Sequence, residues 1–302
     1  MTQLRRILLL GAAGQVGLEL QRSFAGAGEI VACDRRHCDM ADADKLRDLI
    51  RDTAPDLILN AAAYTAVDRA ETETQSATAI NATAAGVVAE EAARRNILLV
   101  HYSTDYVFDG SKDGPWLETD QPNPLNHYGA SKLAGERAIA EAGGRSLIFR
   151  TSWVYGPHGN NFLLTMLRVG RERDRLTVVD DQTGTPTTSM ALADATRTIV
   201  DGVVAGGFGS AEDWAGVYHM TCSGSTTWCG FAREIFARAE RQLGQRRPEV
   251  VPIATEAWPT PARRPRNSVL SNERLRSRFG VQLPDWRVEL DRTFERLSPV
   301  IR

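Results

Sequence analysis

The stretch ILLLGAAGQVGLELQRSF, residues 7–24, decides the fold. Its first four residues form a continuous apolar run, which is typical of a strand buried on both faces of a parallel sheet. From residue 18 onward the apolar side chains recur at helical spacing. The turn between them has the pattern G-x-x-G-x-x-G, which supplies a tight bend, room for a pyrophosphate against the backbone and a close contact between helix and strand. We therefore predict a dinucleotide site at Gly11, Gly14 and Gly17, in front of the helix N-terminus.

Alternating strands and helices continue outward from this stretch. Four further strands are predicted over residues 29–33, 56–60, 97–103 and 146–150. Helices are predicted over residues 42–53 and 72–95. This order of elements predicts an α/β fold, in which a doubly wound parallel sheet of Rossmann type binds ligands at the carboxyl ends of its strands.

The regular alternation ends near residue 151. The stretch 248–265 carries five prolines, which interrupt long helices and central strands. We therefore expect residues 1–151 to form an NAD(P)-binding domain, with residues 189–222 returning to it. The remaining residues, 152–188 and 223–302, are expected to form a smaller C-terminal substrate-binding lobe.

The second predicted strand leads into Asp34-Arg35-Arg36, at the offset where an acidic residue meets the adenosine ribose. Asp34 would accept hydrogen bonds from the 2′-hydroxyl of NADH, whereas Arg35 and Arg36 would pair with the 2′-phosphate of NADPH. We favour NADPH and leave NADH open. Ala61 and Ala63 follow the third strand, where small residues let a dinucleotide lie against the backbone.

A second set of polar residues follows the later strands. Ser103-Thr104-Asp105 lies at the end of the fourth strand, where ligands bind in open parallel sheets. Beyond a loop-rich segment, Tyr128 and Lys132 stand four residues apart at a helix opening, so their side chains are neighbours. A nearby ammonium favours the phenolate and lowers the phenol pKa. The two residues are therefore a candidate proton-transfer pair.

Composition excludes several function classes. The 302 residues carry a formal net charge of -2, so bulk electrostatics attracts the chain neither to nucleic acid nor to a membrane surface. No apolar run is long enough to span a bilayer, and the four cysteines lack metal-binding spacing. We expect a cytoplasmic protein in which an arginine of the cluster 263–266 reaches a substrate diphosphate rather than a nucleic acid.

Further motifs extend over nearly the whole chain. They lie at residues 61–68, 103–110, 150–156, 181–187 and 262–268, besides the glycine turn and the Tyr128/Lys132 pair. With these motifs the sequence resembles the extended short-chain dehydrogenase/reductases and, among them, the family of dTDP-4-dehydrorhamnose reductases. The resemblance implies NAD(P)H-dependent reduction of the C4 ketone of dTDP-4-dehydro-L-rhamnose to dTDP-L-rhamnose, in nucleotide-sugar synthesis for cell-envelope polysaccharide.

The resemblance also implies a role for individual residues. Tyr128 would be the general acid, Lys132 would lower its pKa and hold the nicotinamide ribose, and Thr104 would tune Tyr128. The implied substrate contacts are Thr104, Asp105, Trp153 and Arg264. The implied cofactor contacts, besides those above, are Gln15, Val16, Asp39, Met40, Ala63, Tyr64, Thr65 and Tyr102.

Some members of this family dimerise through a magnesium ion held by glutamates. Glu19 has a suitable place in the sequence, but Ser189 stands where a carboxylate is expected, and Mg²⁺ needs several oxygen ligands. We therefore expect a monomer, or a homodimer without metal. Two alternatives stay open, namely a reductase or epimerase of another nucleotide sugar, and a non-catalytic regulatory subunit on the same fold.

Overall fold

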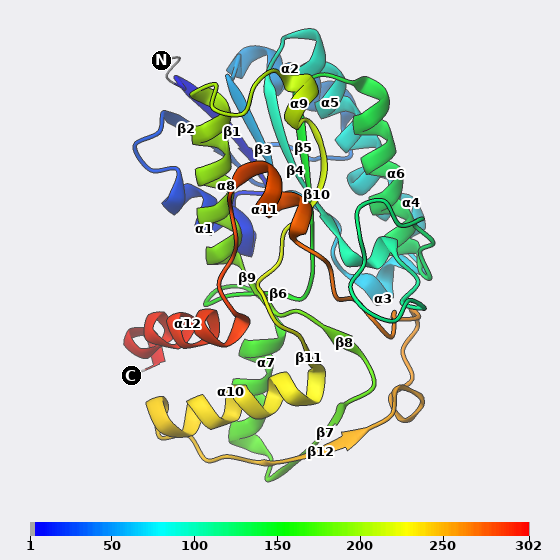
Figure 1. The fold of residues 1–302 in the computed structure, drawn as a ribbon, viewed down its shortest axis with the longest axis vertical. Helices are drawn as coiled ribbons and strands as arrows, with labels where there is room; N and C mark the ends of the chain where they lie inside the picture. Colours follow the sequence, from blue (N-terminus) through cyan, green and yellow to red (C-terminus); the bar gives the residue numbers. More distant parts are fainter. Residues whose placement is uncertain (1–3, 302) are drawn as a thin grey trace.

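A six-stranded parallel sheet organises the fold, in a computed structural model that describes residues 4–301 (Figure 1). The strand order is β10-β5-β4-β3-β1-β2, and every neighbouring pair is parallel. The strands are β1 Arg6–Leu10, β2 Glu29–Cys33, β3 Leu57–Asn60, β4 Leu98–Thr104, β5 Ser146–Thr151 and β10 Gly216–His219. This is the doubly wound sheet that the sequence predicts, so the predicted fold class is confirmed.

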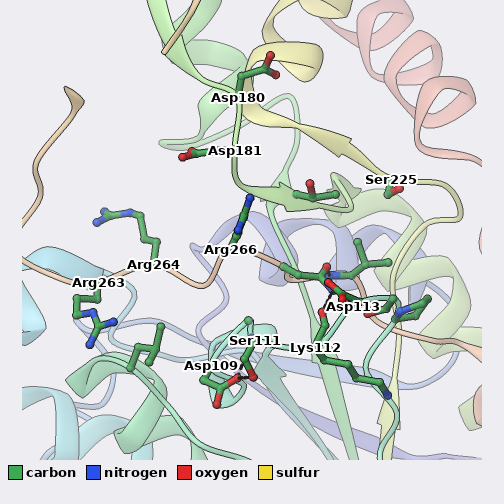
Figure 2. Close-up of a pocket in the computed structure, with 17 residues that line it drawn as sticks. Asp109, Ser111, Lys112, Asp113, Asp180, Asp181, Ser225, Arg263, Arg264 and Arg266 are labelled. Carbon is green, nitrogen blue, oxygen red and sulfur yellow. Dashed lines mark hydrogen bonds between the residues drawn. The ribbon is translucent and has the colours of Figure 1, made fainter. Parts of the chain in front are cut away.

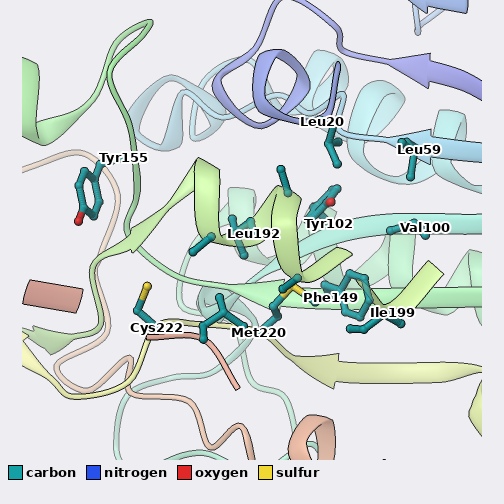
Figure 3. Packing of buried hydrophobic residues seen from close by; sticks show 14 of the residues in the cluster. Leu20, Leu59, Val100, Tyr102, Phe149, Tyr155, Leu192, Ile199, Met220 and Cys222 are labelled. Atoms are coloured by element: carbon teal, nitrogen blue, oxygen red, sulfur yellow. The ribbon is translucent and has the colours of Figure 1, made fainter. Parts of the chain in front are cut away.

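Helices cover both faces of the sheet, because the strands are apolar on both sides. Ile7 and Leu9 of β1 belong to the core cluster under α1 and α8, part of which Figure 3 shows. Leu8 and Leu10 point the other way, into the cluster under α2, α5 and α6. Alternate residues of one strand thus enter two separate cores. These helices are α1 Gln15–Ser23, α2 Ala43–Thr53, α5 Ala84–Arg94, α6 His127–Ala142 and α8 Ser189–Val204.

The helix predicted over residues 72–95 is a continuous helical segment with a wide turn in its middle. It comprises α4 Thr74–Thr78, the π-helical turn η1 Ala79–Thr83 and α5. Within that turn, the Asn81 side chain accepts from the backbone N–H of Tyr64 at 2.9 Å and donates to its carbonyl oxygen at 3.1 Å. Asn81 also donates to Ser131 of α6 at 2.9 Å. The turn therefore ties the segment after β3 to α6.

The elements after β5 lie partly on the sheet and partly beyond the carboxyl ends of its strands (Figure 1). In the second group, α7 and α10 pack together beside the parallel strand pair β7 and β12. Within residues 4–301, no helix is both long and apolar enough to span a bilayer. The bounds of the elements not yet given are α3 Val67–Ala70, η2 Asp105–Val107, β6 Val154–Tyr155, α7 Phe162–Glu172, β7 Arg175–Val179, β8 Thr183–Gly184, β9 Thr187–Thr188, α9 Ala211–Trp214, β11 Thr226–Thr227, α10 Trp228–Leu243, β12 Glu249–Ile253, η3 Thr255–Ala257, α11 Glu273–Phe279 and α12 Trp286–Ile301.

A buried ion pair fixes α6 against the sheet. Glu136 accepts from Arg150 of β5 at 2.9 and 2.6 Å, and both residues are 4% exposed. Ser103 of β4 donates to the same carboxylate at 2.5 Å. The neighbouring Gly135 lets the helix approach closely, since a β carbon there would lie 2.1 Å from the carbonyl oxygen of Asn81. The rotation of α6 about its axis is therefore determined by buried contacts.

Glu136→Gln should destabilise the fold strongly, because it leaves the Arg150 charge buried without a counter-charge. We expect the free energy of unfolding to fall by about 3 kcal/mol or more. Glu141→Gln, at an exposed position of the same helix, should change it by less than about 0.5 kcal/mol. Urea unfolding followed by circular dichroism measures both values. Equal stability of the two variants would contradict a structural role for the pair.

Candidate active site

The packing of the first turn of α6 fixes the position of Tyr128. Asn126 caps the helix by accepting a 2.8 Å hydrogen bond from the backbone N–H of Gly129. A β carbon at Gly129 would lie 2.1 Å from the carbonyl oxygen of Tyr106, so the helix starts in backbone contact with the segment after β4. The rings of Tyr106 and Tyr128 meet edge to face, with centroids 5.7 Å apart. These contacts place the phenol within hydrogen-bonding reach of Thr104.

Lys132 is buried one turn further along α6. Its Nζ donates to the carbonyl oxygen of Tyr102 at 2.6 Å and lies 3.1 Å from Nε2 of His101. Nδ1 of His101 is in turn 3.0 Å from the side-chain nitrogen of Asn60, at the end of β3. Burial lowers the pKa of Lys132 to about 8, although the charge of Glu136 acts in the opposite direction. The ammonium is thus held against the sheet and loses its proton slightly above neutral pH.

Burial also controls the acidity of the phenol. It raises the pKa of Tyr128 to about 12, while the hydrogen bond with Thr104 acts in the opposite direction. The sequence analysis expected Lys132 to lower this pKa. Instead the lysine bonds to Tyr102, and no hydrogen bond joins it to the phenol among the described residues. The phenol is therefore protonated at neutral pH, which is the form that a general acid needs.

These side chains border a cavity of about 580 Å³, which we call the catalytic cavity. Predicted site residues from five separate parts of the chain line it, namely Gly14, Gln15, Val16, Ala61, Ala63, Thr65, Tyr102, Thr104, Tyr128, Lys132 and Trp153. The structure therefore brings the predicted proton-transfer pair, two predicted substrate contacts and the glycine turn to one place.

A second cavity, of about 380 Å³, extends along the glycine turn, and we call it the adenosine cavity. It shares Gly14, Ala61 and Ala63 with the catalytic cavity. Gly11 has φ +79°, and a β carbon there would lie 2.6 Å from the backbone nitrogen of Ala62. The two cavities are adjacent, because they share these small lining residues, and this arrangement fits a dinucleotide. Predicted site residues that line the second cavity are Gly11, Gly14, Asp34, Arg35, Asp39, Met40, Ala61 and Ala63.

Asp34 and Arg36 are engaged with each other at the edge of the adenosine cavity. Arg36 donates to the Asp34 carboxylate at 2.7 Å, and Nδ1 of His37 lies 2.8 Å from its other oxygen. Hydrogen bonds from Arg36 and His37 hold the pKa of Asp34 well below its usual range. Arg35 lines the same cavity, and its guanidinium makes no hydrogen bond or ion pair within residues 4–301. A free cation therefore stands at the predicted ribose position.

Besides Arg264 and Glu19, which are described below, three predicted site residues line neither cavity. A β carbon at Gly17 would lie 2.2 Å from the carbonyl oxygen of Gly11, so Gly17 serves the contact between α1 and the turn. The Tyr64 hydroxyl donates to Glu73 at 2.7 Å. Asp105 is buried, and burial raises its pKa to about 7. These residues lie outside both cavities, and Gly17 and Asp105 contact residues that line them.

A third cavity, of about 970 Å³, is rich in charged side chains (Figure 2). Its charged lining residues are Asp109, Lys112, Asp113, Asp180, Asp181, Arg263, Arg264 and Arg266. The predicted substrate residue Arg264 forms a bidentate pair with Asp68, at 3.0 and 2.8 Å. The guanidinium groups of Arg263 and Arg266 make no hydrogen bond or ion pair among the described residues. Arg264 thus borders a different cavity from Thr104 and Trp153.

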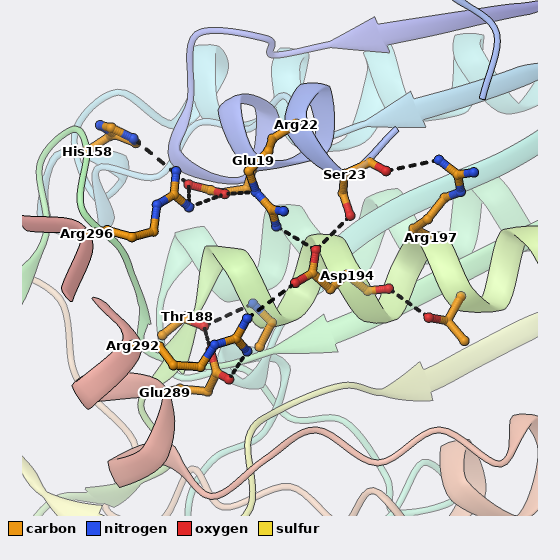
Figure 4. Close-up of polar contacts among 12 residues, drawn as sticks. Glu19, Arg22, Ser23, His158, Thr188, Asp194, Arg197, Glu289, Arg292 and Arg296 are labelled. Carbon is orange, nitrogen blue, oxygen red and sulfur yellow. Dashed lines mark hydrogen bonds and ion pairs between the residues drawn. The ribbon is translucent and has the colours of Figure 1, made fainter. Parts of the chain in front are cut away.

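The carboxylate of Glu19, the predicted residue of a magnesium site, is engaged by arginines (Figure 4). Arg296 lies 2.8 and 2.7 Å from its two oxygens, and Arg22 donates to one of them at 2.8 Å. Ser189 begins α8 and offers no carboxylate. Among the residues that the structure describes, no group of three or more His, Cys, Asp or Glu could hold a metal ion. These residues do not fit Mg²⁺, because guanidinium groups occupy the oxygens that it would need.

The sequence analysis did not select every residue at the site. Gly159 and Asn160 line the catalytic cavity, in the loop after β6. Asn161 ties this loop to the glycine turn by donating to the Gln15 side chain at 2.8 Å. That contact joins residues 146 positions apart, so no local pattern pointed to it. His101 was missed for another reason, since it looks like an ordinary residue of a buried strand.

The whole chain is similar to known proteins. The model of the family described as the RmlD substrate binding domain matches residues 5–298. The curated dTDP-4-dehydrorhamnose reductase of Burkholderia thailandensis is 50% identical over 290 residues, which cover 93% of this chain and 95% of that protein. Its counterpart in Escherichia coli K12 is 45% identical over 298 residues, covering 96% and 97%.

Solved structures agree with these relatives. The dTDP-4-dehydrorhamnose reductase from Bacillus anthracis, in complex with NADP, has a TM-score of 0.88 and 35% identity, covering 97% of this chain and 99% of that one. The UDP-glucose 4-epimerase from Brucella ovis, in complex with NAD, has a TM-score of 0.77 at 18% identity over 98% of both chains, which shows the fold alone. The family predicted from sequence motifs is confirmed. From the match over residues 5–298 and the identity to curated relatives, the chain belongs to the RmlD substrate binding domain family of dTDP-4-dehydrorhamnose reductases.

Proposed function

We propose that this protein reduces the C4 ketone of dTDP-4-dehydro-L-rhamnose to dTDP-L-rhamnose with a nicotinamide dinucleotide. One observation carries the proposal. Tyr128, Thr104 and Lys132 meet in a cavity that is continuous with the glycine turn, in a chain whose curated relatives are dTDP-4-dehydrorhamnose reductases. No observation favours an epimerase or a regulatory subunit over this activity.

When bound, a reduced nicotinamide would supply a hydride to C4, and residues of this chain would stabilise and protonate the negative charge that develops on O4. Tyr128 is protonated at neutral pH and donates its proton to that oxygen. The Thr104 hydroxyl, beside the phenol, orients the sugar oxygen. The ammonium of Lys132 would hold the nicotinamide ribose. Because Thr104 and Lys132 are buried and Tyr128 is partly buried, their hydrogen bonds act in a medium of lowered dielectric, which strengthens them.

The third cavity suits the nucleotide diphosphate of the substrate. Arg263 and Arg266 border it with unpaired guanidinium groups, which bind phosphate oxygens well. The guanidinium of Arg264 is paired with Asp68, so it would act on the diphosphate through its positive charge rather than through direct hydrogen bonds. In this arrangement residues 1–151 and 189–222 would bind the dinucleotide and supply Thr104, Tyr128 and Lys132, whereas residues 152–188 and 223–302 would contribute Trp153, Arg263 and Arg266 to the sugar-nucleotide site. The assembly would be a monomer or a metal-free homodimer.

The preferred cofactor would be NADPH. Asp34 is occupied by Arg36 and His37, so its carboxylate is less available to a ribose 2′-hydroxyl. The free guanidinium of Arg35 offers a partner for a 2′-phosphate.

Tyr128→Phe should nearly abolish turnover, because it removes the proton donor. With dTDP-4-dehydro-L-rhamnose generated in situ, we expect kcat to fall by about 100-fold or more. NADPH consumption followed by absorbance measures this rate. Tyr64→Phe, which removes a hydroxyl outside both cavities, serves as the control and should keep most of the activity. Undiminished turnover by Tyr128→Phe would refute the acid role.

NADPH binding should weaken as the pH rises through about 8. The pKa of Lys132 is lowered to about 8, so its ammonium is present below that pH and is lost above it. We expect Kd to rise by up to about tenfold per pH unit above that point, and to stay level in Lys132→Met. Isothermal titration calorimetry at several pH values measures both curves. A level curve for the unmodified protein would show that the lysine charge does not contribute.

Arg35→Ala should impair the use of NADPH more than that of NADH. Losing a charged hydrogen bond to the 2′-phosphate should raise KM for NADPH by about tenfold or more, with NADH changed by less than about threefold. Arg36→Ala is the matched control, since Arg36 is bound to Asp34, and its effect should be smaller. Initial rates with both dinucleotides decide the question. An equal loss with NADPH and NADH would argue against phosphate recognition by Arg35.

A further inference from the structure

The backbone of Trp153 has an unfavourable conformation. Its φ is +47°, in the left-handed region that bulky side chains rarely adopt. Such a conformation persists only where the surroundings determine it, and it is concentrated at functional sites. Trp153 lines the catalytic cavity together with Tyr128 and Thr104. The strain therefore lies at the wall of the site where the sugar would bind.

Hydrogen bonds to one neighbouring segment hold this backbone in place. The Ser152 hydroxyl donates to the carbonyl oxygen of Thr185 at 2.8 Å. The backbone N–H of Thr187 donates to the carbonyl oxygen of Trp153 at 3.3 Å. Beyond Trp153, the short strand β6 pairs with β9. Both neighbours of Trp153 in the chain are thus fixed to residues 185–188.

The indole of Trp153 is fixed separately, by two residues that are distant in sequence. Its ring stacks on that of Trp228, with centroids 3.6 Å apart and planes 7° from parallel. Trp228 packs in turn against Phe162, with centroids 4.7 Å apart. Gly184 approaches the same indole so closely that a β carbon there would lie 2.4 Å from Cε2. The stacked ring of Trp228 on one side and the backbone of Gly184 on another leave the Trp153 indole little freedom to move.

One structural unit supplies both of these residues. Strand β8, which contains Gly184, pairs antiparallel with β11, whose last residue Thr227 is the N-cap of α10. Thr227 accepts from the backbone N–H of Gly230 at 2.9 Å and also hydrogen-bonds to Asp180. Trp228 is the first residue of that helix. The position of the indole therefore depends on how the β8·β11 pair and α10 are placed.

We propose that Trp228, together with Gly184, is a positioning residue that holds the Trp153 indole against the sugar of the substrate. The proposal rests on the proposed function, because it assumes a sugar beside Tyr128. A deoxysugar presents C–H groups that pack on an aromatic face, and a fixed ring loses little entropy when it binds one. Trp228 would act only through Trp153.

A double-mutant cycle tests the proposal. Trp228→Leu should lower kcat/KM for the sugar nucleotide by about tenfold or more, through KM, while Kd for NADPH changes by less than about twofold. In a Trp153→Leu background the same substitution should change kcat/KM by less than about twofold, because the ring that it positions is gone. Trp228→Phe keeps an aromatic face and should recover most of the loss. Trp258→Leu, which removes a tryptophan that is 58% exposed, controls for tryptophan loss in general.

Each outcome of the double-mutant cycle either supports the positioning role of Trp228 or overturns it. If Trp228→Leu lowers kcat/KM equally in the unmodified protein and in Trp153→Leu, or does not lower it in the unmodified protein, the positioning role is overturned. If Trp228→Leu does not fold, Gly184→Ala replaces it, since its β carbon must displace the indole from another side. A selective rise in KM would then support the proposal, and an unchanged KM would overturn it. The unmodified protein is assayed first, because absence of turnover would refute the proposed function, whereas an additive cycle in an active enzyme refutes only this inference.

Discussion

The ion pair between Glu136 and Arg150 is the contact on which the site depends. It anchors α6 to β5 in the protein interior, so the helix can neither slide nor rotate without burying an unpaired charge. Lys132 and Tyr128 lie four and eight residues before Glu136, so the three side chains share one helical face. The face that packs against the sheet is therefore also the face that carries the proposed catalytic residues. Packing, rather than a flexible loop, sets where the phenol lies.

Burial has opposite effects on the two ionisable groups of this face. It raises the pKa of Tyr128 and lowers that of Lys132, because it disfavours the charged form of each. Attraction between ammonium and phenolate would have moved both pKa values the other way. The lysine instead bonds to the carbonyl oxygen of Tyr102. A reductase that protonates an alkoxide benefits from this balance, since the phenol keeps its proton until a stronger base is formed beside it.

Local pattern was enough to predict the sheet, the glycine turn and the Tyr128/Lys132 pair, because each depends on residues a few positions apart. It could not predict that Asp68 holds Arg264, since those residues are 196 positions apart. The stack of Trp153 on Trp228 was hidden for the same reason. The expectation for the Tyr128 pKa differed because sequence shows the charge of a neighbour but not the depth of burial, and burial was the larger effect.

Two contacts between residues that are distant in sequence also fix the walls of the cavities in which a sugar nucleotide would bind. Arg264 with Asp68 links the loop between η3 and α11 to α3, and Trp153 with Trp228 links the segment between β5 and β6 to α10. Each contact joins a residue near the catalytic or third cavity to an element that lies elsewhere in the sequence. Both contacts are made entirely within the chain. A site held in this way loses less conformational entropy on binding than one assembled from mobile loops, so in the proposed reaction more of the binding energy remains for orienting the ketone toward Tyr128.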